Sequence, residues 1–121
     1  DRVMPGVTKD ELLSLVQETR NIEANDRIFD YITTLAEATR THPMVELGVS
    51  PRGALALCRM AKAHAFLAGR DFVVPEDVAS VFPDVCAHRL ILSAKARMME
   101  EKAENILAEI LKSVDMPVLK A

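Results

Sequence analysis

The stretch SPRGALALCRMAKAHAFLAG, residues 50–69, constrains the fold more than any other part of the sequence. Ser50 is a preferred helix-capping residue and Pro51 suits the first helical position, while Gly69 is typical of the position just after a helix end. Most residues between them are apolar, and the basic side chains fall on one narrow stripe of the predicted helix. The sequence therefore predicts a central helix that is buried over most of its circumference.

Two helices are predicted before this central helix. Thr8 and Glu11 form a capping-box pattern at the start of a helix over about residues 9–19. Asn25 is a suitable cap for a second helix, over about residues 26–41. The segment RNIEAN between them breaks the helical pattern and is expected to be extended. The second helix places four residues on one face at spacings of three and four: Ile28, Ile32, Leu35 and Thr39.

Two helices are predicted after it. Pro75, with acidic residues in the turn that follows, begins a short fourth helix. A last helix is expected over about residues 94–114, with a Glu/Lys face toward solvent. MVELGV is read as a connector, and HRLILS fits either a strand or a helix. The predicted fold class is therefore mainly all-α, a bundle of five helices with one or two short strands. The last helix is expected to bury Met99, Ala103, Ile106, Leu107, Ile110, Leu111 and Val114.

Composition limits the classes of function. A chain of 121 residues can bury one core, and its net charge of −3 disfavours binding to nucleic acid through a basic surface. Cys58 and Cys86 are too few for a disulfide framework and are expected to be intracellular free thiols. No apolar run approaches the roughly 20 residues of a membrane span, and we expect no secretory signal. A cytoplasmic protein without membrane contact is expected, and the missing initial Met suggests a piece of a longer chain.

Arg52 falls at the second position of the central helix, where its charge is unfavourable. A helix N-terminus is already positive, so a cation there costs about 0.3–1 kcal/mol. The same geometry becomes favourable where an anion binds, because the dipole, the amides and the guanidinium then attract it together. Gly53 lowers helix propensity and removes a side chain that would hinder approach to the backbone. Arg52 is thus either a surface residue, solvated or paired with a carboxylate such as Glu46, or part of an anion site.

Other catalytic patterns are missing from the sequence. The P-loop pattern G-x-x-x-x-G-K-[ST] does not occur, and no carboxylate pair follows a hydrophobic strand, so we expect no ATP hydrolysis by this chain alone. Cys86 and His88 are close in sequence, but zinc requires three or four ligands. A Cys–His nucleophile pair would lack an orienting group. We expect structural roles for both residues and no metal site.

Motifs at the start of the central helix and beyond its end point to a family. Residues 48–90 contain, in this order, G-x-S-P-R, G-R-D-F-V-V-P-E-D-V and H-R-L. Together with YITTLAEATRTHPMVELG, residues 31–48, they closely resemble the C-terminal lid of the MoxR family of AAA+ ATPases. The resemblance covers about residues 10–117. Three positions depart from the family pattern: Val49 replaces the usual small residue, Gly53 the usual Ala and Val74 the usual Thr cap.

The resemblance implies one helical lid domain over residues 1–121, hinged to a P-loop core that lies N-terminal to it. It identifies Arg52 as the sensor-2 arginine, which reaches the terminal phosphates of ATP from the lid, with Pro51 beside it. ATP and Mg²⁺ would serve the full-length ATPase, and we expect no tight binding to this chain alone. Tyr31 and Ile32 are weaker candidates for contact with adenine, with core packing as the alternative. Arg40 and Arg89 match family positions without an assigned chemistry and could face a neighbouring subunit.

The resemblance also implies partners. These are the protein's own AAA+ core, the neighbouring subunits of a hexameric ring, and proteins that carry a von Willebrand A domain. ATP hydrolysis would drive their chaperone-like assembly or activation, although the sequence names no client. The alternative is a self-standing, histone-fold-like interaction module without nucleotide chemistry, because VVPEDV also suits such domains. The acidic net charge disfavours a DNA-binding version of that alternative.

Overall fold

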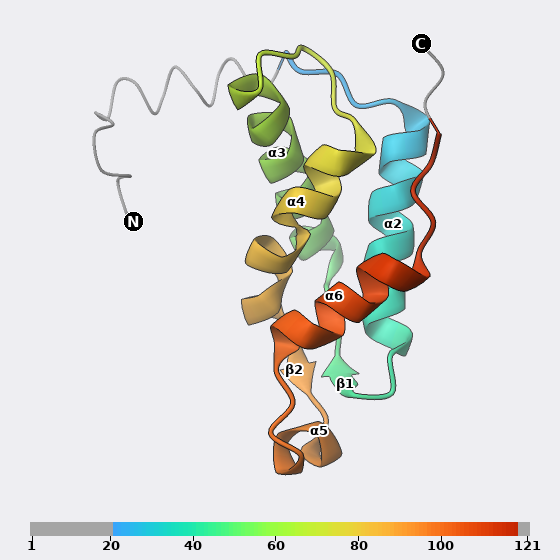
Figure 1. The fold of residues 1–121 in the computed structure, drawn as a ribbon, viewed down its shortest axis with the longest axis vertical. Coiled ribbons are helices and arrows are strands. Elements are labelled where there is room, and N and C mark those ends of the chain that lie inside the picture. Colours follow the sequence, from blue (N-terminus) through green and yellow to red (C-terminus); the bar gives the residue numbers. More distant parts are fainter. Residues whose placement is uncertain (1–20, 119–121) are drawn as a thin grey trace, which may run out of the picture.

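The computed structural model describes residues 21–118, so the helix expected over residues 9–19 lies outside the described residues. Within this range the fold is a bundle of five α-helices with a short two-stranded sheet, which confirms the predicted class (Figure 1). The elements are α2 (Asp26–Thr41), β1 (Val45–Leu47), α3 (Pro51–Leu67), α4 (Pro75–Cys86), the 3₁₀ turn η1 (Ala87–Arg89), β2 (Ile91–Leu92), α5 (Ala94–Met98) and α6 (Ala103–Ser113).

Helix α2 begins and ends where local chemistry predicts. The side chain of Asn25 accepts a hydrogen bond from the amide of Ile28 at 3.0 Å, which satisfies one of the free donors of the first turn. The helix ends at Thr41, two residues before Pro43. Its buried face includes all four predicted residues and extends to two neighbours; the full set is Ile28, Tyr31, Ile32, Leu35, Ala36 and Thr39.

Helix α3 is capped as predicted but is less buried than predicted. The Ser50 hydroxyl accepts a hydrogen bond from the Gly53 amide at 3.2 Å, and Gly69 follows the helix with φ +81°. However, Leu55 is 50% exposed and Leu67 is 71% exposed. Among the described elements α3 packs mainly on α4 and less extensively on α2, so only one side is covered. The buried residues of α3 are Gly53, Leu57, Cys58, Ala61 and Ala65.

Two extended segments pair at the other end of the bundle from the sheet. Glu23, in the segment RNIEAN, forms an isolated parallel bridge with Phe72. The Glu23 amide donates to the Asp71 carbonyl at 2.9 Å, and the Val73 amide donates to the Glu23 carbonyl at 2.9 Å. Both segments are therefore extended, which the sequence predicts for RNIEAN, and their pairing holds the chain before α2 against the α3–α4 connection.

A buried carboxylate joins α3 to α4. Asp77 is fully buried and accepts hydrogen bonds from the Val74 amide at 2.8 Å and from the Arg70 guanidinium at 2.5 and 2.7 Å. His64 Nδ1 lies 2.6 Å from the same carboxylate. Burial alone would raise the pKa of Asp77, but the hydrogen bonds from Arg70, Val74 and His64 outweigh it and lower that pKa. Asp77 thus also stabilises the start of α4, where Val74 has no side-chain cap to offer.

The segments HRLILS and MVELGV form the small sheet. HRLILS divides into the turn η1 and strand β2, and MVELGV contains strand β1, which the sequence did not distinguish from a connector. The strands are antiparallel, with Val45 opposite Leu92 and Leu47 opposite Ile91, and with an irregularity between these pairs. The sheet lies beside the start of α3, at the lower end of the molecule in Figure 1.

The single last helix expected over residues 94–114 is wrong, because the chain forms α5 and α6 with a break between them. Glu100 adopts a left-handed conformation with φ +55°. The Glu100 amide donates to the Arg97 carbonyl at 3.1 Å and the Glu101 amide to the Ala96 carbonyl at 2.9 Å, the pattern of a helix-terminating Schellman motif. Met99, expected to be buried, is therefore 57% exposed. Ile106, Leu107 and Ile110 are buried as predicted, whereas Ala103, Leu111 and Val114 are only half-buried.

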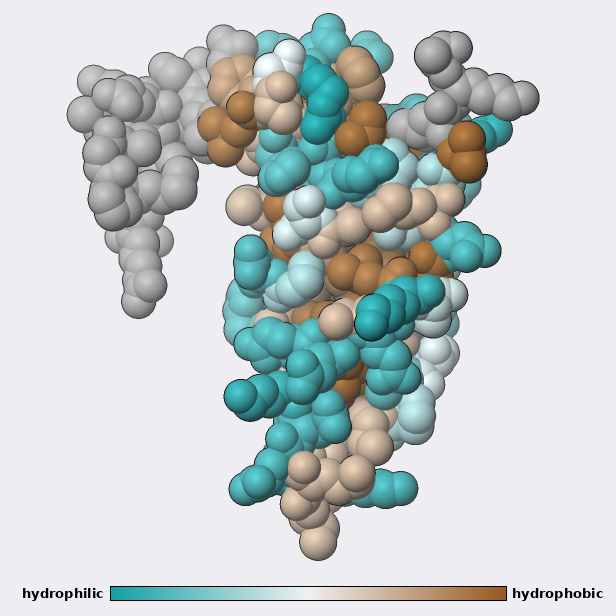
Figure 2. Space-filling view, viewed as in Figure 1, coloured by the Kyte–Doolittle hydropathy of each residue, from teal (hydrophilic) through white to brown (hydrophobic). Residues whose placement is uncertain are grey.

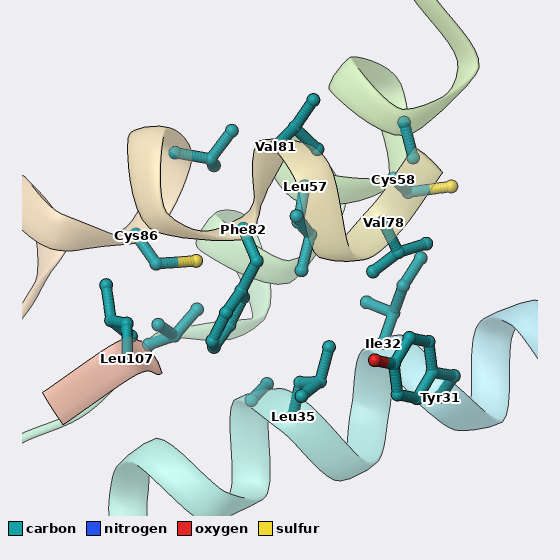
Figure 3. Packing of buried hydrophobic residues seen from close by; sticks show 14 of the residues in the cluster. Tyr31, Ile32, Leu35, Leu57, Cys58, Val78, Val81, Phe82, Cys86 and Leu107 are labelled. Atoms are coloured by element: carbon teal, nitrogen blue, oxygen red, sulfur yellow. The ribbon is translucent and has the colours of Figure 1, made fainter. Parts of the chain in front are cut away.

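One hydrophobic core joins α2, α3, α4 and α6. Figure 3 shows Phe82 of α4 between Leu35 of α2 and Leu57 of α3, with Leu107 of α6 nearby. Cys58 and Cys86 are free thiols in this core, and burial raises the pKa of Cys86 to about 11. Figure 2 shows hydrophilic side chains over much of one face, with hydrophobic surface near α4 and α6. None of the helices in residues 21–118 is long and apolar enough to cross a membrane.

Candidate functional site

The N-terminus of α3 carries an unusual charge. Helices α2, α4 and α6 each have an acidic residue in the first turn, which complements the helix dipole, whereas α3 and the five-residue α5 have none and carry Arg52 and Lys95 there. Arg52 is exposed, and within residues 21–118 no ion pair or hydrogen bond is recorded for its side chain. The alternative pairing with Glu46 is therefore not observed. A solvent-facing guanidinium at the positive end of a helix can bind an anion.

The guanidinium is the main donor at this helix end. Pro51 has no amide hydrogen, the Gly53 amide donates to the Ser50 hydroxyl, and the Ala54 amide donates to the Ser50 carbonyl at 2.9 Å. Among the described residues, the amides of Ser50 and Arg52 have no hydrogen-bond partner at this helix end. An anion at this end would thus be held by the Arg52 side chain and the helix dipole, with a smaller contribution from backbone amides than an uncapped helix would make.

Both backbone groups of Val49, three residues before Arg52, are held by the end of α2. The Val49 amide donates to the Thr39 hydroxyl at 2.9 Å, and the Val49 carbonyl accepts from Arg40 Nε at 2.9 Å. The Thr39 hydroxyl in turn donates to the Ala36 carbonyl at 2.6 Å. These contacts fix the chain that leads into α3 against the last turn of α2.

Gly48 allows this close approach. A Cβ atom at Gly48 would lie 2.7 Å from the Cα and N atoms of Arg40 and 2.8 Å from the carbonyl carbon of Thr39. These are backbone atoms and cannot move aside without shifting α2. The glycine is therefore required by contact between the connector and α2, a role that its place in the G-x-S-P-R motif does not reveal.

Gly53 is explained by its neighbours. A Cβ atom at this position would lie 2.8 Å from Cγ1 of Val49 and 3.3 Å from Cδ of Arg89. Val49 is fully buried, so its side chain occupies the space that an alanine at position 53 would need. The two departures from the family pattern, a larger residue at 49 and a smaller one at 53, are thus spatially compensating.

A pocket adjoins the start of α3. Its volume is about 410 Å³, and it is lined by Arg40, Leu47, Gly48, Val49, Ser50 and Arg89, with no carboxylate in the lining. Arg40 pairs with Glu37 at 2.9 Å, while Arg89 Nε donates to the Val85 carbonyl at 3.2 Å. The structure therefore brings Arg40 and Arg89, which are 49 positions apart, to the same end of the bundle as Arg52.

The remaining predicted site residues lie in different surroundings. Pro51 is exposed and precedes Arg52 in the first turn of α3. Tyr31 and Ile32 are buried in the core, 3% and 4% exposed, and lie about 13 Å along α2 from Arg40. Burial and the charge of Glu76 raise the pKa of Tyr31. The structure does not bring these two residues to Arg52, and their contact with adenine stays a prediction.

The structure places Cys86 and His88 in different surroundings. Cys86 is buried in the core, and His88 is exposed on η1. Within the same residues, no group of three His, Cys, Asp or Glu side chains is arranged to hold a metal ion. Among the helices of eight or more residues in residues 21–118, α3 is the one whose first turn carries a basic side chain and no acidic one.

The chain is similar to known proteins over most of its length. The family model described as "AAA lid domain" matches residues 37–110, which include the end of α2, the pocket and Arg52. The uncharacterized protein YeaC of Bacillus subtilis is 39% identical over 117 residues, covering 97% of this chain and 37% of YeaC. Chaperone MoxR1 of Mycobacterium tuberculosis is 32% identical over 120 residues, covering 92% of this chain and 32% of MoxR1.

A solved structure has the same fold. The crystal structure of a protein from Cytophaga hutchinsonii, described as a putative ATPase, aligns with a TM-score of 0.83 and 31% sequence identity. The alignment covers 91% of this chain and 36% of that one. The chain spans about a third of the length of the relatives it matches.

The chain belongs to the AAA lid domain family. The relatives and the fold of the chain identify it further as the lid of a MoxR-family AAA+ ATPase. This family assignment replaces the alternative of a histone-fold-like interaction module.

Proposed function

We propose that this chain closes over ATP bound by the P-loop core of a longer protein and places Arg52 against the terminal phosphates. The observation that carries the proposal is the exposed Arg52 in the first turn of α3, a turn that contains no acidic residue. Bound phosphate would supply the negative charge that this helix end attracts. A guanidinium also offers the planar, bidentate geometry that suits phosphate oxygens.

The chemistry of this chain is limited to its own residues. Arg52 orients the terminal phosphates and stabilises the charge that develops on them, and Pro51 sets the backbone of the turn that carries it. Mg²⁺ would be bound with ATP by the core, because the residues of this chain supply neither the phosphate-binding loop nor a pair of metal-binding carboxylates after a strand. Closure of the lid also removes water from the phosphates, which strengthens the contact of Arg52.

Nucleotide state would control the position of the lid. With ATP bound, Arg52 holds the lid closed, and release of phosphate after hydrolysis removes that contact, so the helical bundle moves as one body. In a ring, this motion would change the contacts of the lid with neighbouring subunits and with protein partners. One relative is named a chaperone, which supports chaperone-like assembly or activation of partner proteins. The family resemblance implies that these partners are proteins that carry a von Willebrand A domain.

The test is ATP turnover by the full-length protein with Arg52→Ala. We expect turnover to fall about tenfold or more, because a charge-assisted contact is worth about 1.5–3 kcal/mol. Arg59→Ala is the matched control: Arg59 is exposed on the same helix, seven residues after Arg52. Unchanged turnover with Arg52→Ala, or an equal loss with Arg59→Ala, would exclude the phosphate contact.

The isolated chain provides a second test. We expect at best millimolar affinity for ATP, since only the lid side of the site is present. Calorimetric titration of the 121-residue chain measures this directly, and micromolar binding would reveal a nucleotide site within the chain itself.

A further inference from the structure

We propose that Thr39 and Arg40 are positioning residues for Arg52: they bind both backbone groups of Val49 and so set the direction in which α3 begins. The inference rests on the proposed phosphate contact of Arg52. It assigns a role to the end of α2, which carries no phosphate ligand in the proposed function.

The hydrogen bonds of Thr39 distinguish a positioning role from simple packing in the core. The hydroxyl of Thr39 is fully buried and has one partner on each side, the Ala36 carbonyl at 2.6 Å and the Val49 amide at 2.9 Å. The hydroxyl donates its one hydrogen atom to the Ala36 carbonyl and accepts the hydrogen bond from the Val49 amide. Because Thr39 is buried, it cannot touch a nucleotide at the surface, and it acts on Arg52 only through the chain.

Arg40 completes the contact from the other side of the same residue. Its Nε donates to the Val49 carbonyl at 2.9 Å, and its Nη1 donates to Glu37 at 2.9 Å. The pairing with Glu37 keeps the guanidinium in place over the connector. With both the amide and the carbonyl of Val49 held, rotation of the chain at this residue would break at least one hydrogen bond.

Few free torsions lie between Val49 and Arg52. Ser50 is fixed by its cap to Gly53, and the ring of Pro51 fixes its own φ. The direction of the first helical turn is therefore determined at Val49 and transmitted to Arg52. Such precision matters for a phosphate contact, because displacing a catalytic group by ~1 Å can reduce a rate on the order of 10²-fold.

The first experiment measures the contact itself in the 121-residue chain, by amide hydrogen exchange of Val49. Thr39→Val keeps the shape of the side chain and removes the hydroxyl, and we expect exchange of Val49 to become about tenfold faster. Thr39→Ser should restore slow exchange. The matched control is Thr34→Val, which removes an exposed hydroxyl of α2 that bonds only to the Asp30 carbonyl. Exchange of Val49 that is unchanged by Thr39→Val would overturn the contact.

The second experiment measures ATP turnover by the full-length protein in a double-mutant cycle. We expect Thr39→Val to lower turnover about tenfold and Thr34→Val to leave it unchanged. Arg40→Gln should lower turnover in the same way as Thr39→Val. If Thr39 acts through Arg52, adding Thr39→Val to Arg52→Ala lowers turnover no further. An equal tenfold loss in the Arg52→Ala background, or no loss with Thr39→Val alone, would overturn the positioning role.

The two failures are distinguishable. If Arg52→Ala alone leaves turnover unchanged, the proposed phosphate contact is wrong and the positioning role falls with it, whatever Val49 exchange shows. If Arg52→Ala lowers turnover and the Thr39→Val loss is independent of it, the phosphate contact stands and only the positioning role fails.

Discussion

Val49 and Gly53 provide the sharpest test of the packing at the start of α3. Each departs from the family pattern, and the missing Cβ of Gly53 would lie 2.8 Å from Cγ1 of Val49. Replacing either residue alone should therefore disturb the contact, whereas replacing both with alanine should relieve it. The perturbation is the cycle formed by Val49→Ala, Gly53→Ala and the double variant.

The expected magnitudes follow from the contact. Gly53→Ala gains about 1 kcal/mol of helix propensity but overpacks a fully buried contact at a cost of about 2 kcal/mol, so it destabilises by about 1 kcal/mol. Val49→Ala empties part of the core and costs about 2.5 kcal/mol. In the double variant the new Cβ has room, the helix gains its propensity and the cavity is partly filled, so the loss is only about 1 kcal/mol.

The assay is the free energy of unfolding from urea titrations of the four proteins, followed by far-ultraviolet circular dichroism. The additive expectation is about 3.5 kcal/mol of destabilisation for the double variant, so we predict a coupling of about 2.5 kcal/mol. Coupling below about 0.5 kcal/mol, the level found for independent sites, would refute the argument that the two departures compensate for one another.

Two further predictions concern stability away from the site. The pKa of Asp77 is lowered in the folded protein, so its contribution is present above the unfolded value of about 4 and is lost as the pH falls through the folded pKa. Asp77→Asn should cost about 2 kcal/mol at pH 7 and should flatten the loss of stability in acid, measured by urea titration from pH 7 to pH 2; an equally steep acid loss would contradict this assignment. Glu100→Gly should stabilise the chain by about 1 kcal/mol, because Glu100 has φ +55°, whereas Glu101→Gly should destabilise it; thermal unfolding that gives the same sign for both would contradict the turn geometry.

The helix ends were predictable because their signals are local. Asn25, Ser50 and Pro75 act within one turn of the helix that each begins, and Gly69 ends α3 through its own positive φ. Short patterns of residues are sufficient for such features. The break between α5 and α6 was not predictable in the same way, since a glutamate occupies the left-handed position that usually holds glycine or asparagine, and apolar residues continue on both sides of it.

Burial of α3 was overestimated for a different reason. Composition shows that a helix is apolar but does not show how many neighbours it has, and Leu55 and Leu67 face away from α2 and α4. The unfavourable position of the Arg52 charge could be predicted from the sequence, because it depends only on the place of the residue within the helix. The contacts that support Arg52 could not, because Thr39 fits the apolar face of α2 by spacing, and its bond to Val49 depends on the path of the connector between them.

The most direct measurement of the central claim is a comparison of ATP and ADP affinities for the full-length protein, with and without Arg52→Ala. A contact with the terminal phosphate of ATP affects ATP far more than ADP. We predict that the Kd for ATP rises at least tenfold, while the Kd for ADP changes by less than about twofold. Equal weakening of both nucleotides, or no change in either, would contradict the placement of Arg52 at the terminal phosphates.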